Sequence, residues 1–297
     1  MQINAKGLIK LIDKIYDKTS KISFSTYGDD FLRYFGEYAE IIHELGTEIE
    51  TLKGRNKRLD KLVLVDDGTL QNWEFEFKDL DEDTLKKSWG YNNLKSAETG
   101  KIVDSFIVSF GNPDNCDETF DIGRSIHFAP IIKYFQKMGL PEKLKNIEEK
   151  VRNNEKVDIF DELTLIFVTL SAHDKDKQET LNRVCDVLKE VDYIDNFRRK
   201  VIDSLIAFQI ENFIDSQKER DRLNRVVDMQ MSVEELFKQV FLEDEYDKGF
   251  DEGYDEGKNE MILNLLKKSA SIDFIEDVSG CSRGHILKIR NQNFAGK

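Results

Sequence analysis

The sequence predicts an α/β fold, in which a mixed β-sheet flanked by helices is followed by an all-helical C-terminal region. Three observations lead to this prediction. Residues 47–78 contain three short segments with the alternating or β-branched patterns of strands. Residues 82–98 have helical periodicity and precede an apolar strand at 102–110, which predicts a β-α-β crossover with parallel strands. After about residue 125 the apolar residues recur at helical spacing.

We expect four parts along the chain: a helical or flexible lead-in at 1–24, an α/β core at 25–125, a helical region at 126–240 and a tail at 241–297. The elements expected in the α/β core are a helix at 29–45, strands at 47–52, at 59–65 and from the hairpin turn to about residue 78, a helix at 82–98 and a strand at 102–110. The helices expected after it span 125–138, 142–152, 158–171, 176–192 and 194–225.

Composition restricts the class of protein. The 297 residues are 39% hydrophobic and 34% charged, as in a charge-rich globular protein. Apolar runs are too short for a membrane helix and no signal sequence is evident, so we expect a cytoplasmic protein. The three cysteines, Cys116, Cys185 and Cys281, are far apart and suggest reduced thiols. Because the formal net charge is −14, any DNA binding must be local.

The segment Trp73–Lys78 alternates aromatic and charged residues with the period of a strand. Glu74, Glu76 and Lys78 therefore project from one face, opposite the aromatic side chains. Two carboxylates and an ammonium on one strand are groups that can bind a divalent metal and polarise a water molecule. If Asp60 joins them, its hard oxygen ligands favour Mg²⁺ or Mn²⁺ and predict a phosphodiester-cleaving site.

The register of the hairpin decides whether Asp60 meets these residues. A three-residue loop, Asp66-Asp67-Gly68, pairs Val65 with Thr69 and places Asp60 opposite Glu74. A two-residue loop at Asp67-Gly68 places Asp60 opposite Phe75, on the other face. The hydrophobic pattern is tolerable in both registers, so both remain open at this stage, as does an exposed strand with ordinary cross-strand ion pairs.

Two local basic stretches are candidate DNA contacts, although each is also consistent with ordinary surface charge. The first comprises Lys53, Arg55, Lys57, Arg58 and Lys61. The second, in the tail, comprises Arg283, Lys288, Arg290 and Lys297. The tail also repeats Gly-aromatic-Asp-Glu at 249–256, which on a helix forms a glycine stripe, and its residues 271–290 suit either a helix-turn-helix or a plain helical hairpin.

Several of these motifs together resemble a known family. An Asp on the second strand and a Glu-x-Glu on the third, within an αβββαβ order, resemble the PD-(D/E)XK nuclease superfamily. More narrowly, the segments 47–52, 58–60, 67–68 and 72–76 resemble the recombination-promoting nuclease / putative transposase family, whose members read T-E-L-Q-T, R-x-D and h-I-E-F-Q at similar separations. The glycine repeat and the Ser-Gly-Cys-Ser turn at 279–282 resemble the tail of that family.

The resemblance implies a restriction-endonuclease-like core and a Mg²⁺-dependent DNA endonuclease linked to recombination or mobile elements. By position, Asp60 and Glu74 match the metal-binding acids, and Glu48 matches the first-strand Glu of the family. Glu76 stands where members have Gln, so the site is either Glu74-x-Glu76 or the superfamily pattern Glu76-x-Lys78. The alternatives are an inactive nuclease-fold module for DNA tethering or protein assembly, and a nuclease that cuts RNA. A homodimer is also expected if both DNA strands are cut.

Overall fold

The structure is a computed structural model that describes residues 5–50, 56–191 and 195–227, together with single positions between 232 and 289. The side chains at 5–13, 48–50 and 56–58 lie outside the described part. The chain divides into two compact units, residues 1–240 and 241–297. Each unit is described by itself.

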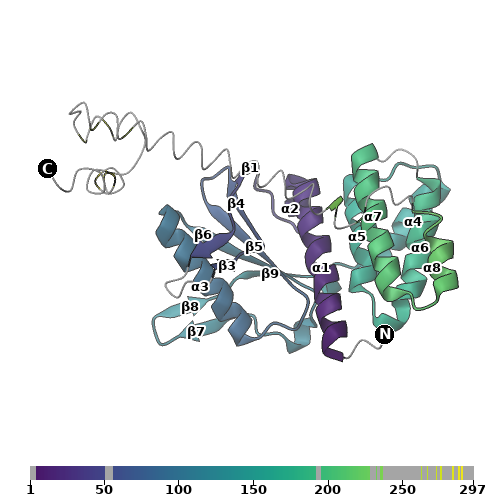
Figure 1. The fold of residues 1–297 in the computed structure, drawn as a ribbon, viewed down its shortest axis with the longest axis horizontal. Helices are drawn as coiled ribbons and strands as arrows, with labels where there is room; N and C mark the ends of the chain where they lie inside the picture. The colour runs from purple at the N-terminus through teal and green to yellow at the C-terminus, as the bar shows by residue number, and fades with distance from the viewer. Residues whose placement is uncertain are drawn as a thin grey trace. The chain divides into compact units, whose positions relative to one another are not determined.

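The first unit is built on a mixed five-stranded sheet in the order β1-β4-β5-β6-β9 (Figure 1). β1, β4 and β5 pair antiparallel, whereas β5, β6 and β9 run parallel, so the predicted parallel crossover is confirmed. The strands of this sheet are β1 (Ile41–Glu44), β4 (Lys61–Val65), β5 (Leu70–Glu76), β6 (Val103–Ser109) and β9 (Ile131–Tyr134). Two small two-stranded sheets, β2 (Glu48–Glu50) with β3 (Asn56–Arg58) and β7 (Phe120–Ile122) with β8 (Ile126–Phe128), accompany it.

Helices cover both faces of the sheet. α1 (Ala5–Tyr27) and α2 (Asp29–Tyr34) pack on one face, and α3 (Glu82–Thr99) packs on the other. α1 lies between the sheet and a helical bundle, with contacts to both (Figure 1). The bundle consists of α4 (Leu140–Arg152), α5 (Ile159–Ser171), α6 (Lys177–Glu190), α7 (Asn196–Phe213) and α8 (Gln217–Leu223). The expected α/β class with a helical C-terminal part is therefore found.

Aromatic packing fills the layer between the sheet and α1. The Trp73 ring stacks on Phe106 of the neighbouring strand with a centroid distance of 4.4 Å. Phe24 of α1 and Phe31 of α2 contact the same indole at 6.0 and 6.2 Å. Alternation along β5 puts these aromatic residues on one face and leaves the even-numbered residues for α3.

A buried hydrogen bond from Tyr27 joins α1 to an ion pair of the bundle. The Tyr27 hydroxyl donates to Glu162 of α5 at 3.2 Å, and Arg198 of α7 pairs with the same carboxylate at 2.9 Å. The expected bundle core on α5 is confirmed, because its residues from Glu162 to Leu170 are buried. α1 is therefore part of the first unit's core along its described side chains.

The helix predicted at 29–45 is wrong in its second half. α2 ends at Tyr34, and Gly36 has a φ of 76°, a left-handed conformation that continues no helix. The chain then forms β1, which pairs with β4. The apolar residues after Gly36 happen to fall at helical spacing, but two of them are exposed: Tyr38 at 78% and Ile42 at 63%.

The helix predicted at 125–138 is also wrong. This segment contains β8 and β9, with Pro130 between them. Proline lacks the N–H that a helix interior needs, and the β-branched pair Ile131-Ile132 suits a strand. β9 extends the sheet beyond the expected αβββαβ order by pairing parallel with β6.

Three further elements differ in their bounds. The strand predicted at 47–52 is present as β2, but it pairs with β3 outside the main sheet. The strand predicted at 59–65 is interrupted at Leu59-Asp60, between β3 and β4. The single helix predicted at 194–225 is two helices, α7 and α8, separated where Ile214 becomes extended.

In the tail unit, the described positions are helical. Ile262, Ile275 and Ile289 are buried together in a small cluster. The glycine repeat at 249–256 lies outside the described residues, as does the turn of the suggested helix-turn-helix. In the described part of the chain, no helix is both long and apolar enough to cross a membrane.

Gly68 and Gly90 offer a matched pair of glycine substitutions. Gly68 has a φ of 87° in the hairpin turn, and a Cβ there meets no atom within 4 Å, so Gly68→Ala should cost about 1 kcal/mol through backbone strain alone. Gly90 lies inside α3 with equally open space, so Gly90→Ala should raise the free energy of unfolding by about 0.5–1 kcal/mol. Urea unfolding measures the change in this free energy for both variants. A stabilising effect of Gly68→Ala would contradict the turn geometry.

Candidate functional site

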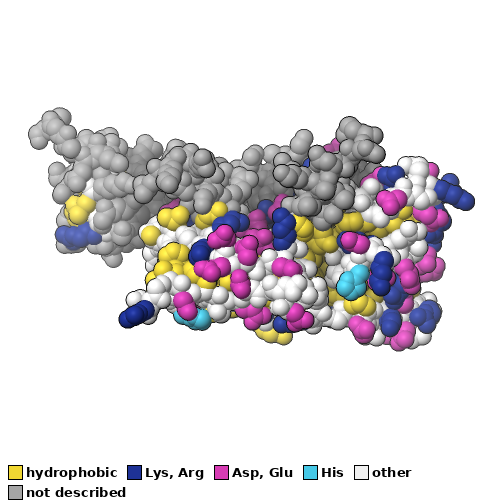
Figure 2. All heavy atoms as spheres, turned by 90° about the horizontal axis from the view of Figure 1, so that it is seen from below, with side chains coloured by type: hydrophobic (Ala, Val, Ile, Leu, Met, Phe, Trp, Pro, Cys, Tyr) yellow, Lys and Arg dark blue, Asp and Glu magenta, His cyan; other side chains and the backbone are white. Residues whose placement is uncertain are grey.

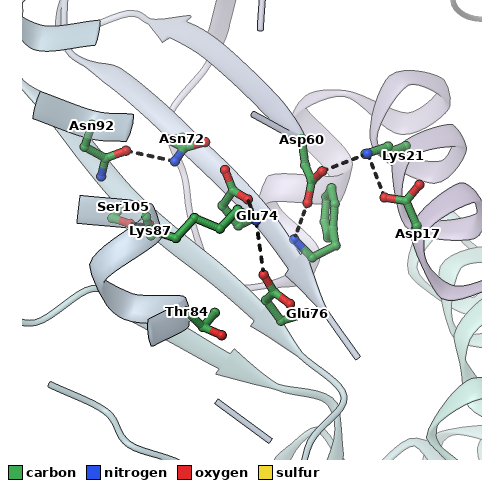
Figure 3. Close-up of polar contacts among 12 residues, drawn as sticks. Asp17, Lys21, Asp60, Asn72, Glu74, Glu76, Thr84, Lys87, Asn92 and Ser105 are labelled. Atoms are coloured by element: carbon green, nitrogen blue, oxygen red, sulfur yellow. Dashed lines mark hydrogen bonds and ion pairs between the residues drawn. The ribbon is translucent and has the colours of Figure 1, made fainter. Parts of the chain in front are cut away.

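The hairpin adopts the three-residue turn. Lys61 pairs with Trp73 and Leu62 with Asn72. Extended by one residue, this register places Asp60 opposite Glu74. The Val65 N–H donates to the Thr69 carbonyl at 3.1 Å, as that register requires. Of the two registers left open by the sequence, this is the one that brings Asp60 toward the glutamates (Figure 3).

Asp60 lies in the interruption between β3 and β4, and both of its carboxylate oxygens are engaged. Oδ2 accepts a hydrogen bond from the Phe75 N–H at 2.9 Å. Oδ1 pairs with the Lys21 ammonium of α1 at 2.7 Å, and Lys21 also binds Asp17 at 2.6 Å. Burial lowers the pKa of Lys21, but the two carboxylates outweigh this effect and leave it raised. Asp60 is thus held in place by a backbone amide and a lysine.

Glu74 is the buried member of the site. It is 2% exposed, and its Oε1 atom has no hydrogen-bond partner. Burial, together with the charge of Asp60, raises the pKa of Glu74 to about 8, although Lys87 opposes this. A buried carboxylate with a free oxygen is stabilised either by a proton or by a bound cation.

Glu76, the last residue of β5, shares a lysine with Glu74. The Lys87 ammonium lies 3.7 Å from Glu74 Oε2 and 3.7 Å from Glu76 Oε1 (Figure 3). Burial raises the pKa of Glu76, and the charge of Asp60 adds to this against the opposing effect of Lys87. Burial lowers the pKa of Lys87, but the three carboxylates outweigh it, so its pKa is raised.

The start of α3 determines where Lys87 lies. Asp81 is the N-cap of this helix, and its carboxylate accepts from the Thr84 N–H at 2.8 Å. Farther along, Asn92 accepts from the Asn72 side chain at 2.8 Å, and Ser88 bonds to Ser105 at 2.9 Å. These contacts fix α3 on the face of β5 that carries the two glutamates.

Lys78 lies past the end of β5 and is exposed, with its ammonium 5.0 Å from the centroid of the Phe77 ring. Lys87, on the helix above, makes the ion pairs with Glu74 and Glu76. Glu48 lies in β2, where its backbone pairs with Arg58, but its side chain is outside the described part.

The predicted DNA contacts are mostly not described. Lys53, Arg55, Lys288, Arg290 and Lys297 lie outside the described residues, and Lys57 and Arg58 are described only as backbone in β3. Arg283 is helical and exposed in the tail unit. Lys61 is buried and pairs with Glu44 of β1, so it is not a surface contact.

Sequence reasoning missed both lysines of the site. Lys21 belongs to a segment interpreted as a lead-in, so no partner could be assigned to it. Lys87 lies two residues after Leu85 and before Trp89, on a helix whose inward face was assigned from apolar residues alone. A lysine near the inward side of a helix that crosses over a strand with two glutamates is the signal that could have found it.

These acids are not assembled as a metal centre. Among the described residues, no three His, Cys, Asp or Glu side chains come together as a group that could hold a metal ion. Lys21 and Lys87 instead supply the positive charge beside the carboxylates. The donor set is nevertheless of the hard-oxygen kind, and the free Oε1 of Glu74 is an available ligand atom.

Comparisons of the chain with protein-family models, curated proteins and solved structures find no match. The functional argument therefore rests on the site itself.

The raised pKa of Glu74 predicts a pH-dependent stability. An unfolded Glu releases its proton near pH 4.3, whereas the folded chain retains it up to about 8. The folded state binds the extra proton in this window, so its stability falls as the pH rises through it, by on the order of 5 kcal/mol. Glu74→Gln should remove this component. The measurement is the difference between the urea unfolding free energies of wild type and variant across this range; parallel curves contradict the assignment.

Proposed function

We propose that the chain is a metal-dependent endonuclease that hydrolyses phosphodiester bonds in DNA, with a site of the PD-(D/E)XK kind. One observation carries the proposal: the buried Glu74 has an unsatisfied oxygen, feels the charges of Asp60 and Glu76, and shares Lys87 with Glu76. A structural ion-pair network has no need of a buried carboxylate oxygen that lacks a hydrogen-bond partner. A site for a cation does.

Asp60 and Glu74 would hold a Mg²⁺ or Mn²⁺ ion, with Glu76 as a further ligand. The free Oε1 of Glu74 and the mutual repulsion of the three carboxylates fit a cation there. Bound metal would stabilise negative charge on the phosphate and lower the pKa of a coordinated water. Lys21 would then keep its second partner, Asp17, when Asp60 turns to the metal.

Lys87 is the residue that we assign to the phosphate. Its side chain is 44% exposed, so the ammonium can reach a substrate while the two glutamates keep it protonated. An ammonium next to the scissile phosphate stabilises the charge that develops during attack by water. Glu76, 26% exposed at the strand end, would accept a hydrogen bond from that water.

The surface is compatible with local rather than broad DNA contacts. In the described part of the face seen in Figure 2, acidic and basic side chains are intermixed. With a net charge of −14, affinity for DNA must come from few phosphate contacts and should fall steeply with salt.

An inactive nuclease-fold module is the second candidate, and one observation favours it. Lys21 and Lys87 already pair with the carboxylates, and the described residues contain no assembled metal group. In that case the lysines are permanent substitutes for the metal, and the chain acts by binding DNA or protein. A cleavage assay distinguishes the two functions.

The first test is nicking of supercoiled plasmid in Mg²⁺ or Mn²⁺. The wild type should nick, and Asp60→Asn and Glu74→Gln should each lower the rate by about two orders of magnitude or more. Asp104→Asn is the control, because this exposed carboxylate lies at the opposite end of the sheet, at the start of β6. Absence of nicking by folded wild type supports the inactive module; equal nicking by all four proteins means that the site is elsewhere.

Lys87 and Lys86 provide a matched pair on one helix. Lys87→Met should reduce nicking by about 100-fold, because the phosphate loses its ammonium. Lys86→Met should have little effect, since Lys86 pairs with the exposed Glu82 at 2.7 Å. Thermal unfolding shows whether both variants remain folded. If Lys78→Met, rather than Lys87→Met, abolishes nicking, then Lys78 is the lysine that acts on the phosphate.

A further inference from the structure

A hollow in the surface lies away from the three carboxylates of the candidate site. It has a volume of about 650 Å³ and is formed by the end of α2, the edge strand β9 and the start of α4. Three of its lining residues are lysines, Lys133, Lys137 and Lys143, and one is an acid, Glu118. In a chain with a net charge of −14, this is a local excess of positive charge.

The three ammonium groups are only partly neutralised. Lys137 is 4.0 Å from Glu118 and also lies 4.6 Å from the centroid of the Tyr134 ring. Lys143 lies 5.0 Å from the Tyr34 ring, and burial lowers its pKa without an opposing carboxylate. Aromatic rings hold such ammonium groups in place without cancelling their charge.

Lys133 of β9 is the third lysine of the hollow. Its ammonium lies 4.0 Å from the position that a Cβ on Gly36 would occupy, so the glycine turn after α2 leaves room for it. In the described part of the chain no carboxylate pairs with Lys133. Its charge is therefore available to an anion.

Tyr134 lines the hollow from β9. It is 5% exposed, and its hydroxyl is buried beside Cys116 and Glu118, which together with burial raise its pKa. Its ring lies beside the Lys137 ammonium and so helps to position that charge.

We propose that this hollow binds a nucleotide unit, with its phosphate held by Lys133 and Lys143. The hollow is far larger than a phosphate alone, and Phe35, Pro130 and Ile132 give it an apolar wall for a base or sugar. The unit is either a free nucleotide or one nucleotide of a DNA strand, because the recognition chemistry is the same.

The position of the hollow suits a substrate strand that also reaches the carboxylates. Glu76 pairs in register with Ser109, and Ser109 pairs with Tyr134, so both sites lie at the same end of the parallel strands. Two strand spacings, roughly 10 Å, separate the two backbone positions. The nucleotide proposal stands independently of cleavage, since none of its residues belongs to the acidic site.

The test is fluorescence anisotropy with a labelled short single-stranded oligodeoxynucleotide in EDTA and low salt, so that no metal-dependent cleavage can occur. Wild type should bind, and Lys133→Met and Lys143→Met should each weaken binding by about tenfold or more. Lys145→Met is the control, because Lys145 is exposed on α4 and does not line the hollow.

Competition identifies the source of the nucleotide. Displacement by dAMP supports a free nucleotide, and displacement only by unlabelled oligodeoxynucleotide supports a DNA strand. Equal displacement by pyrophosphate and dAMP overturns the nucleotide assignment. Absence of binding by wild type, or equal binding by Lys143→Met and Lys145→Met, overturns the site. Because binding is measured in EDTA, absence of nicking in the plasmid assay leaves this result unaffected, and the two proposals fail separately.

Discussion

The turn at Asp66-Asp67-Gly68 sets the register on which the candidate site depends. With one residue fewer in the loop, Asp60 would lie opposite Phe75 and face the aromatic layer beneath α1. With the observed loop it faces Glu74, and its carboxylate accepts from the Phe75 N–H. The parallel pairing of β5 with β6 then brings α3 across the same face, and Lys87 with it.

The sequence predicted those parts of the fold whose pattern is local and strong. The Glu and aromatic alternation, the helix at 82–98 and the strand after it were found as expected, because burial on one face leaves a clear period. β1 and β9 were missed, since short β-branched segments can match helical spacing and become strands only through their partners in the sheet. One of the two hairpin registers considered from the sequence placed Asp60 opposite Glu74. The positions of Lys21 and Lys87 depend on helix packing, which the sequence alone does not determine.

The site has fewer positively charged side chains than carboxylates, and this imbalance dominates its electrostatics. Two lysines serve Asp17, Asp60, Glu74 and Glu76, and the most buried carboxylate retains a free oxygen. The ionised site therefore contains an unfavourable interaction, which protonation of Glu74 relieves below about pH 8. A divalent ion would relieve it by taking the place of that proton, so the same imbalance connects stability with cation binding.

α1 links this site to the rest of the first unit. Lys21 reaches Asp60 from the same helix whose Tyr27 hydroxyl donates to Glu162, and Arg198 of α7 holds that glutamate. The bundle thus fixes the height and rotation of the helix that presents Lys21. As a consequence, the α/β part should not be stable when it is separated from the bundle. Removing the bundle would expose one side of α1 and leave Asp60 paired with a lysine on an unsupported helix.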